Sequence, residues 1–225
     1  MLLAIDTATR FASIALYDAM GVVAEQSWRS DNNHSVEVPP AIASLLAIQG
    51  AVPGDLTGVA VAKGPGSFTG LRIGMSIAKG LCMALDIPIV AVPTLDIVTF
   101  AAGDPGTPIL SVLEAGRGRV CVGRYRYEEG LPLSDGDIDL VRATEWVVDA
   151  EEPVYVTGEI SAALADQLLS QPDGENIAIS SLAASVRRAG YLGELAWERI
   201  QNDRVDDLDT LGPLYAHYPT SGTAA

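Results

Sequence analysis

The chain has 225 residues, of which 48% are hydrophobic and 19% are charged, a composition typical of folded globular proteins rather than disordered ones. Twenty-nine acidic residues against fourteen basic ones give a net charge of −15, so the surface as a whole repels nucleic acid, and work on RNA would need basic surface from a partner. No apolar run has the roughly 18 residues of a membrane span, and Asp6 stands too early for a signal sequence, so we expect a cytoplasmic chain without membrane contacts.

The first half of the chain is expected to form three meandering strands and then to alternate helix and strand. The expected strands are residues 2–6, 11–17, 22–28, 58–62 and 87–92. The expected helices are 38–49, one that follows a glycine-rich turn and ends near Asp86, and 94–102. Pro39 and Pro40 are tolerated only in the first turn of a helix, so the first helix is expected to begin near Val38.

The second half is expected to repeat this order after a break. Two prolines and a glycine within Asp104–Pro108 interrupt any regular element, which predicts two domains, 1–103 and 104–225. The strands expected in the second half are 109–113, 119–127, 138–142, 154–157 and 177–179, and the helices are 144–149, 161–170 and 184–201. Both halves then have the order βββαβαβα, which suggests a duplicated α/β architecture.

Residues that could carry catalysis or bind a metal are few. Cys82 and Cys121 both lie in apolar stretches, which favours buried thiols over a disulfide. His34 and His217 are the two histidines, and His34 is expected to be a surface or capping residue in a loop. The sequence therefore predicts no metal site and no catalytic centre.

A glycine-rich turn, Lys63–Arg72, joins the strand at 58–62 to the following helix. Its glycines resemble a dinucleotide-binding fingerprint, but the strand is the fourth of its half and no acidic residue ends the next strand. A P-loop is also excluded, because no Gly-Lys-Ser/Thr follows the glycines. Helical phasing instead turns Gly70 and Gly74 inward, which indicates tight packing of the helix on its sheet.

The outward faces of the first two long helices are poorly charged. The first has no charged residue from Val38 to Gln49, although a solvated helix face normally has several. Such faces indicate a surface that something covers, either a protein partner or the chain's own second half. The residues expected on this surface are Pro40, Ala43, Ser44, Ala47, Arg72, Met75, Ser76, Lys79 and Met83.

Several motifs resemble those of the bacterial TsaB (YeaZ) family. They are Leu3-Ala-Ile-Asp-Thr-Ala-Thr9, His34-Ser35, Gly64-Pro-Gly-Ser-Phe-Thr-Gly-Leu-Arg-Ile-Gly74, Ala78-Lys-Gly-Leu81 and Ile87-Pro-Ile-Val-Ala-Val-Pro-Thr-Leu95. The likeness is specific over residues 2–98 and weaker afterwards. Glu114 replaces an aspartate of the family's D-A-R-x-G-E-V segment, and His217 replaces the arginine of its P-x-Y-x-R ending.

The resemblance implies a two-domain fold of the actin and Hsp70 (ASKHA, ribonuclease H-like) class, in agreement with the duplicated order. It also implies a non-catalytic scaffold in the synthesis of N6-threonylcarbamoyladenosine at tRNA position 37. In that family the protein pairs with its catalytic paralogue TsaD through the first two long helices, the ATPase TsaE joins them, and tRNA is met only through the complex. Without TsaD, the same surface is expected to form a homodimer.

The paralogue also bears on metal and nucleotide binding. TsaD has a metal-binding H-x-x-x-H where this chain has Thr94 and Val98, neither of which can replace an imidazole. A weak ATP or ADP site could remain at Asp6, Thr7, Gly66 and Ser67, although polar side chains in such turns more often bond to turn amides. The alternative function is an autonomous nucleotide-dependent enzyme of the sugar-kinase or Hsp70 class; peptidase activity is not expected.

Overall fold

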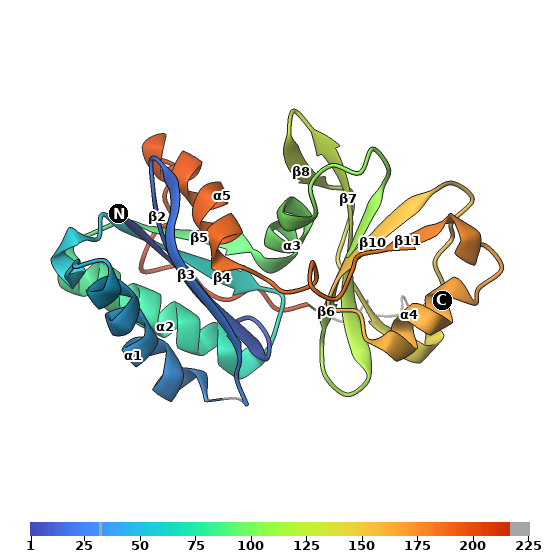
Figure 1. Ribbon diagram of the computed structural model, residues 1–225, viewed down its shortest axis with the longest axis horizontal. Coiled ribbons are helices and arrows are strands. Elements are labelled where there is room, and N and C mark those ends of the chain that lie inside the picture. The colour runs from blue at the N-terminus through green and yellow to red at the C-terminus, as the bar shows by residue number, and fades with distance from the viewer. Residues whose placement is uncertain (32, 217–225) are drawn as a thin grey trace, which may run out of the picture. The chain divides into compact units, whose positions relative to one another are not determined.

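The computed structural model describes residues 1–31 and 33–216, and these divide into two compact units. The first unit combines Met1–Ile97 with Val186–Leu214, and the second is built on Val98–Ser185 (Figure 1). The predicted domains, 1–103 and 104–225, differ from these units in two ways. The second unit begins at Val98 instead of residue 104, and Val186–Leu214 belongs to the first unit. The change of unit falls inside helix α3 (Thr94–Ala102), and the chain returns to the first unit at Val186, because the last helix packs on the first sheet.

A five-stranded sheet of order β3-β2-β1-β4-β5 forms the centre of the first unit. Its strands are β1 (Leu2–Asp6), β2 (Phe11–Asp18), β3 (Gly21–Arg29), β4 (Gly58–Gly64) and β5 (Ile89–Pro93). The first three pair antiparallel, and β1, β4 and β5 pair parallel. All five strands expected from the sequence are confirmed, with ends that differ by one or two residues.

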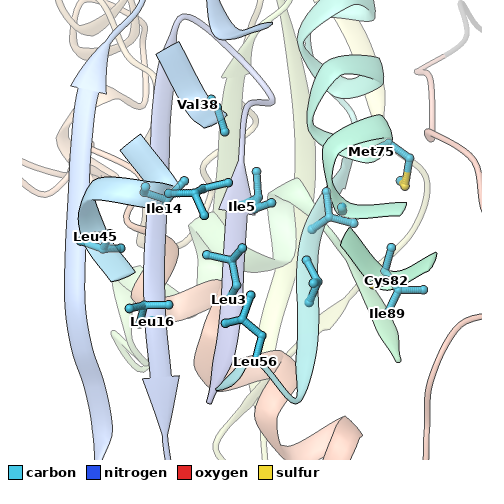
Figure 2. Close-up of a cluster of buried hydrophobic side chains, with 14 of the residues drawn as sticks. Leu3, Ile5, Ile14, Leu16, Val38, Leu45, Leu56, Met75, Cys82 and Ile89 are labelled. Carbon is cyan, nitrogen blue, oxygen red and sulfur yellow. The ribbon is translucent and has the colours of Figure 1, made fainter. Parts of the chain in front are cut away.

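Helices cover both faces of this sheet (Figure 1). Helices α1 (His34–Ile48) and α2 (Phe68–Leu85) lie on one face, and the short 3-10 helix η1 (Pro53–Asp55) precedes β4. Between them and the sheet lies a cluster of large aliphatic side chains, including Leu3, Ile5 and Leu45 (Figure 2). This cluster fixes α1 and α2 on the sheet and so determines which of their sides faces outward.

Helix α5 (Ala189–Gln201) covers the opposite face with small residues at the contact. Ala15, Ala4 and Ala60 occupy one register row across β2, β1 and β4, on the side away from Leu3 and Ile5. A Cβ at Gly193 of α5 would lie about 3.0 Å from the Cβ of Tyr17. Small residues on both partners therefore allow the helix to lie close to the sheet.

Helix α1 begins four residues before the predicted start. Pro39 and Pro40 consequently lie in its second turn, where each removes one backbone donor. Both proline rings lie on the exposed side of the helix, which is where a missing backbone bond is best compensated by solvent. The prediction that prolines mark the first turn is wrong here.

The second unit has a six-stranded sheet of order β11-β10-β6-β7-β8, with β9 also paired to β7. The strands are β6 (Ile109–Glu114), β7 (Arg119–Glu128), β8 (Leu131–Ser134), β9 (Asp139–Arg142), β10 (Val154–Gly158) and β11 (Ile177–Ile179). Helix α4 (Ala162–Leu169) and the 3-10 turns η2 (Ala143–Glu145) and η3 (Gly174–Asn176) complete it. Its own hydrophobic cluster includes Val112, Val156 and Leu168.

Three predictions for the second half differ from the structure. Strand β8 was not expected, the helix expected at 144–149 is only the single turn η2, and α5 begins at Ala189 instead of 184. Strand β8 pairs antiparallel with β7 through a Glu129-Gly130 turn. The hairpin is hard to recognise in the sequence because β8 is short and mostly exposed.

Candidate functional site

The turn between β1 and β2 lies directly against the glycine-rich turn before α2. The hydroxyl of Thr7 donates to the backbone oxygen of Gly70 at 2.8 Å, and the backbone N–H of Ser67 donates to the oxygen of Ala8 at 2.6 Å. Ser67 caps α2, since its Oγ accepts from the N–H of Gly70 at 3.3 Å. The four residues considered for a nucleotide, Asp6, Thr7, Gly66 and Ser67, are thus brought together in two turns that contact each other.

Glycine is required here by close approach. A Cβ at Gly66 would overlap the backbone oxygen of Ala8, one at Gly70 would overlap the oxygen of Thr7, and one at Gly74 would overlap the Thr7 hydroxyl. The inward orientation of Gly70 and Gly74 is therefore confirmed. Two backbone donors at the start of α2 that could cradle a phosphate, those of Ser67 and Gly70, are already bonded within the protein.

Asp6 forms a buried ion pair with Arg187. The Arg187 Nε lies 2.9 Å from Asp6 Oδ2, and the two side chains are 3% and 1% exposed. The other carboxylate oxygen accepts from the backbone N–H of Ala8 at 2.9 Å, while Arg187 also donates to the Thr9 hydroxyl and the Phe11 oxygen. Both Asp6 oxygens are occupied, which gives this aspartate a structural role in joining the turn to the segment just before α5. Sequence reasoning missed Arg187, which stands 181 positions from Asp6.

His34 is buried, contrary to the expectation of a surface residue. It is 3% exposed at the start of α1, and its Nε2 donates to the backbone oxygen of Thr9 at 2.9 Å. The contact fixes the tautomer with a proton on Nε2 and ties α1 to the turn after β1. Of the family-like His34-Ser35 pair, His34 is thus part of the packing around this turn, whereas Ser35 is exposed.

The two thiols are buried and free, as predicted. Burial raises the pKa of Cys82 to about 11 and that of Cys121 to about 11. Among the described residues, no group of three or more His, Cys, Asp or Glu side chains is placed to hold a metal ion. Thr94, which stands at the first metal position of the paralogue's motif, accepts from the backbone N–H of Gly64 at 3.1 Å.

The outer face of helices α1 and α2 is apolar and open. The residues expected there that are indeed exposed are Pro40, Ala43, Ser44, Ala47, Arg72, Ser76 and Met83, and Lys79 is half-buried. Val36 and Ile48 of α1, each 73% exposed, and Phe68 of α2, 56% exposed, extend the same face. We refer to these residues together as the outer face.

Met75 does not belong to the outer face. It is 4% exposed and packs in the cluster under α1 and α2, as does Cys82 (Figure 2). The predicted helix phase was centred on the glycines, but α2 also contacts α1, which widens its buried side to include both sulfur side chains. The assignment of Met75 to an exposed surface is wrong.

A groove of about 460 Å³ lies at the start of α2 on this face. Ser35 lines it from α1, and Phe68, Thr69, Arg72, Ile73, Ser76 and Ile77 line it from α2. The guanidinium of Arg72 stacks 3.7 Å from the centre of the Phe68 ring, which holds both side chains in place. The acidic residue of α1, Glu37, is turned toward β3 and accepts from the Trp28 ring N–H at 2.8 Å, a bond that lowers its pKa.

By length and composition alone, α2 is also apolar enough to cross a membrane. Leu71, Ala78 and Cys82 on its inner side are buried against the sheet and α1, which accounts for that composition. The described residues hold no other helix of this kind.

Comparison with known proteins gives concordant results. The family described as TsaD, tRNA N6-adenosine threonylcarbamoyltransferase, matches residues 11–188. The tRNA threonylcarbamoyladenosine biosynthesis protein TsaB of Bacillus subtilis is 35% identical over 201 residues, which cover 88% of this chain and 87% of that protein. TsaB of Escherichia coli is 35% identical over 132 residues, 57% of this chain and 56% of its own length. The structure of YeaZ from Pseudomonas aeruginosa superposes with a TM-score of 0.79 at 22% identity, covering 96% and 99% of the two chains.

These likenesses define an α/β protein of the two-unit, actin-like class. The chain belongs to the TsaB family of tRNA threonylcarbamoyladenosine biosynthesis proteins. Of its two departures from the family motifs, Glu114 is exposed and its backbone N–H donates to Glu159 at 3.0 Å, whereas His217 lies outside the described residues.

Proposed function

We propose that this chain is a non-catalytic scaffold subunit that binds the catalytic paralogue TsaD through the outer face of α1 and α2. The ATPase TsaE joins this pair, and the complex transfers a threonylcarbamoyl group to the adenosine at tRNA position 37 in the cytoplasm. In the absence of TsaD, the outer face pairs with a second copy of the chain.

The observation that carries this proposal is the exposed apolar character of the outer face. Val36, Ile48 and Met83 are each 73% exposed, and they share two adjacent helices with Ala43 and Ala47. Exposure of such an apolar surface to water is unfavourable, and its burial by a partner lowers the free energy. Helix faces with small residues and few charges also allow another helix to approach closely.

The turns around Asp6 support a scaffold over an autonomous enzyme. The carboxylate of Asp6 is bonded to Arg187 and Ala8, and the Thr7 hydroxyl is bonded to Gly70. A phosphotransferase needs such groups to hold a nucleotide, a metal ion or an attacking hydroxyl. Binding of ATP or ADP at this turn would therefore require these bonds to open.

The test is binding to purified TsaD by calorimetry, with variants on and off the outer face. Ala43→Arg and Met83→Glu place charge on exposed positions of α1 and α2 and are expected to weaken binding at least about tenfold, because a charge in a covered apolar contact must be desolvated. Their controls are Ala163→Arg on exposed α4 and Met20→Glu, which is 95% exposed in the β2–β3 turn.

All four variants are expected to unfold at the same denaturant concentration as the wild type. Equal TsaD affinity for the four variants would contradict the interface, whereas a wild-type chain that does not bind TsaD would contradict the scaffold role itself. Met75→Glu is unsuitable as a test because it would bury a charge in the core. Micromolar binding of Mg-ATP with turnover by the isolated chain would favour the enzyme instead.

A further inference from the structure

A cavity of about 470 Å³ lies in the second unit, on the side of the sheet where β7 pairs with β9. The strand register explains its composition. Val122 of β7 stands opposite Asp139 of β9 and shares its face with Arg124, because residues two apart in a strand point to the same side. Buried Leu110, Val122 and Val148 give the cavity an apolar floor. Its volume falls in the range of small-ligand sites, about 300–1,000 Å³.

Carboxylates outnumber cations around this cavity. Those that line it are Asp135, Asp137, Asp139, Glu145 and Asp149, and Arg124 is the guanidinium among them. Asp135 pairs with Arg126 at 3.6 Å, on exposed side chains. Glu145 pairs with Arg142 at 3.5 Å, also on exposed side chains. Within residues 1–31 and 33–216 the other three carboxylates form no ion pair, so three negative charges stand against the one charge of Arg124. The cavity therefore favours a positively charged ligand.

A hydrogen-bond donor without an acceptor lines the same cavity. Trp146 is only 8% exposed, and its ring N–H donates to no group in the part of the chain that the structure describes. This N–H is not fully enclosed, so it still meets solvent, and the cavity is where the otherwise buried ring is open. Buried indole N–H groups normally have an acceptor, as Trp28 has in Glu37. The unused donor indicates a ligand that brings an acceptor, such as a carbonyl oxygen.

We propose that this cavity binds an arginine or lysine side chain presented by a peptide segment of a partner protein. Such a side chain has an apolar stem that matches Leu110 and Val122, and a cationic end that matches the unpaired carboxylates of Asp137 and Asp139. The peptide carbonyl beside it supplies the acceptor that the Trp146 N–H lacks. A polyamine supplies the charge without the acceptor. A metal ion is not favoured, because no three carboxylates among the described residues are grouped to hold one.

The test is an NMR titration of the full-length, ¹⁵N-labelled chain with the blocked tripeptide acetyl-Gly-Arg-Gly-amide. The ring N–H resonance of Trp146 should shift with a dissociation constant of about 1 mM, as expected of so small a ligand. The ring N–H of Trp28, which is bonded to Glu37, should not move. The same tripeptide with citrulline keeps the shape without the charge and should bind about fivefold more weakly. Added salt should weaken binding of the arginine peptide but not of the citrulline peptide.

A pair of double variants assigns the charge to the cavity. Asp137→Asn/Asp139→Asn removes two unpaired carboxylates and should weaken binding of the arginine peptide about fivefold. The control, Asp166→Asn/Asp173→Asn, changes the net charge equally at two exposed positions of the same unit and should bind like the wild type. All four positions are exposed, so both variants should unfold at the same denaturant concentration as the wild type.

Several outcomes would overturn the inference. They include an unmoved Trp146 resonance at about 10 mM peptide, equal binding of the arginine and citrulline peptides, and equal effects of the two double variants. Spermidine that binds as tightly as the peptide would make the cavity a simple cation site. Free arginine that binds more tightly than the tripeptide would assign it to a small amino acid, and either result would overturn the peptide assignment. None of these measurements involves TsaD, so their failure would not bear on the proposed function.

Discussion

Two neighbouring regions of the first unit use their residues in opposite ways. The turns at Asp6 and Gly66 contain residue types that are common in nucleotide-binding turns, yet Asp6, Thr7 and Ser67 bond to other parts of the chain. The outer face of α1 and α2 has no recognisable catalytic motif, yet it leaves large apolar side chains exposed. The conspicuous glycine motif thus builds the fold, whereas the plain helix face is the candidate for function.

The largest effect is expected from breaking the buried ion pair between Asp6 and Arg187. Arg187→Met leaves the buried Asp6 carboxylate without its cation, which should lower the free energy of unfolding by about 3–5 kcal/mol. Arg204→Met, which breaks the exposed pair with Glu198, should cost less than about 1 kcal/mol. Guanidinium unfolding followed by circular dichroism measures both. Similar small losses of stability for the two variants would show that the Asp6–Arg187 pair is more accessible to solvent than its contacts indicate.

A smaller effect is expected where α2 meets the turn at Thr7. Gly70→Ala puts a methyl group against the backbone oxygen of Thr7 and should destabilise the chain by about 1–3 kcal/mol. Gly80→Ala, on an exposed part of the same helix with no neighbour near its Cβ, should stabilise it by about 0.5–1 kcal/mol. In thermal unfolding, Gly70→Ala should lower the melting temperature and Gly80→Ala should raise it. A stabilising Gly70→Ala would argue against packing as the reason for this glycine.

Much of the fold could be predicted because local patterns determine it. The apolar runs of β1, β4 and β5 and the apolar spacing of α1 and α2 predict these elements in kind from the sequence alone, though not their ends. Which of the two sheets α5 packs on could not be predicted in this way. Its Ala189, Leu192 and Ala196 specify one apolar side, but nothing local says which of two sheets that side will cover.

The candidate site was predicted less completely, for similar reasons. Pro40, Ala43 and Ala47 are exposed as expected because α1 contacts the sheet along one narrow side. Met75 was misplaced because α2 packs against two neighbours, and the extra contact with α1 is a tertiary effect. Arg187 was missed because an ion pair between residues so distant in sequence leaves no local pattern.

The contrast between the two sides of α2 is sharpest at consecutive residues, Cys82 at 2% exposure and Met83 at 73%. Burial raises the pKa of Cys82, and likewise of Cys121, from 9.0 to about 11. Well below pH 9 the thiols are protonated in both states and contribute nothing to pH dependence. Between pH 9 and 11 the unfolded chain releases thiol protons that the folded chain retains, so the stability falls as the pH rises. Unfolding at pH 8, 9 and 10 should show this decline, and Cys82→Ala should flatten it, whereas Met83→Ala should leave it unchanged. An unaltered slope in Cys82→Ala would mean that solvent reaches the inner side of α2.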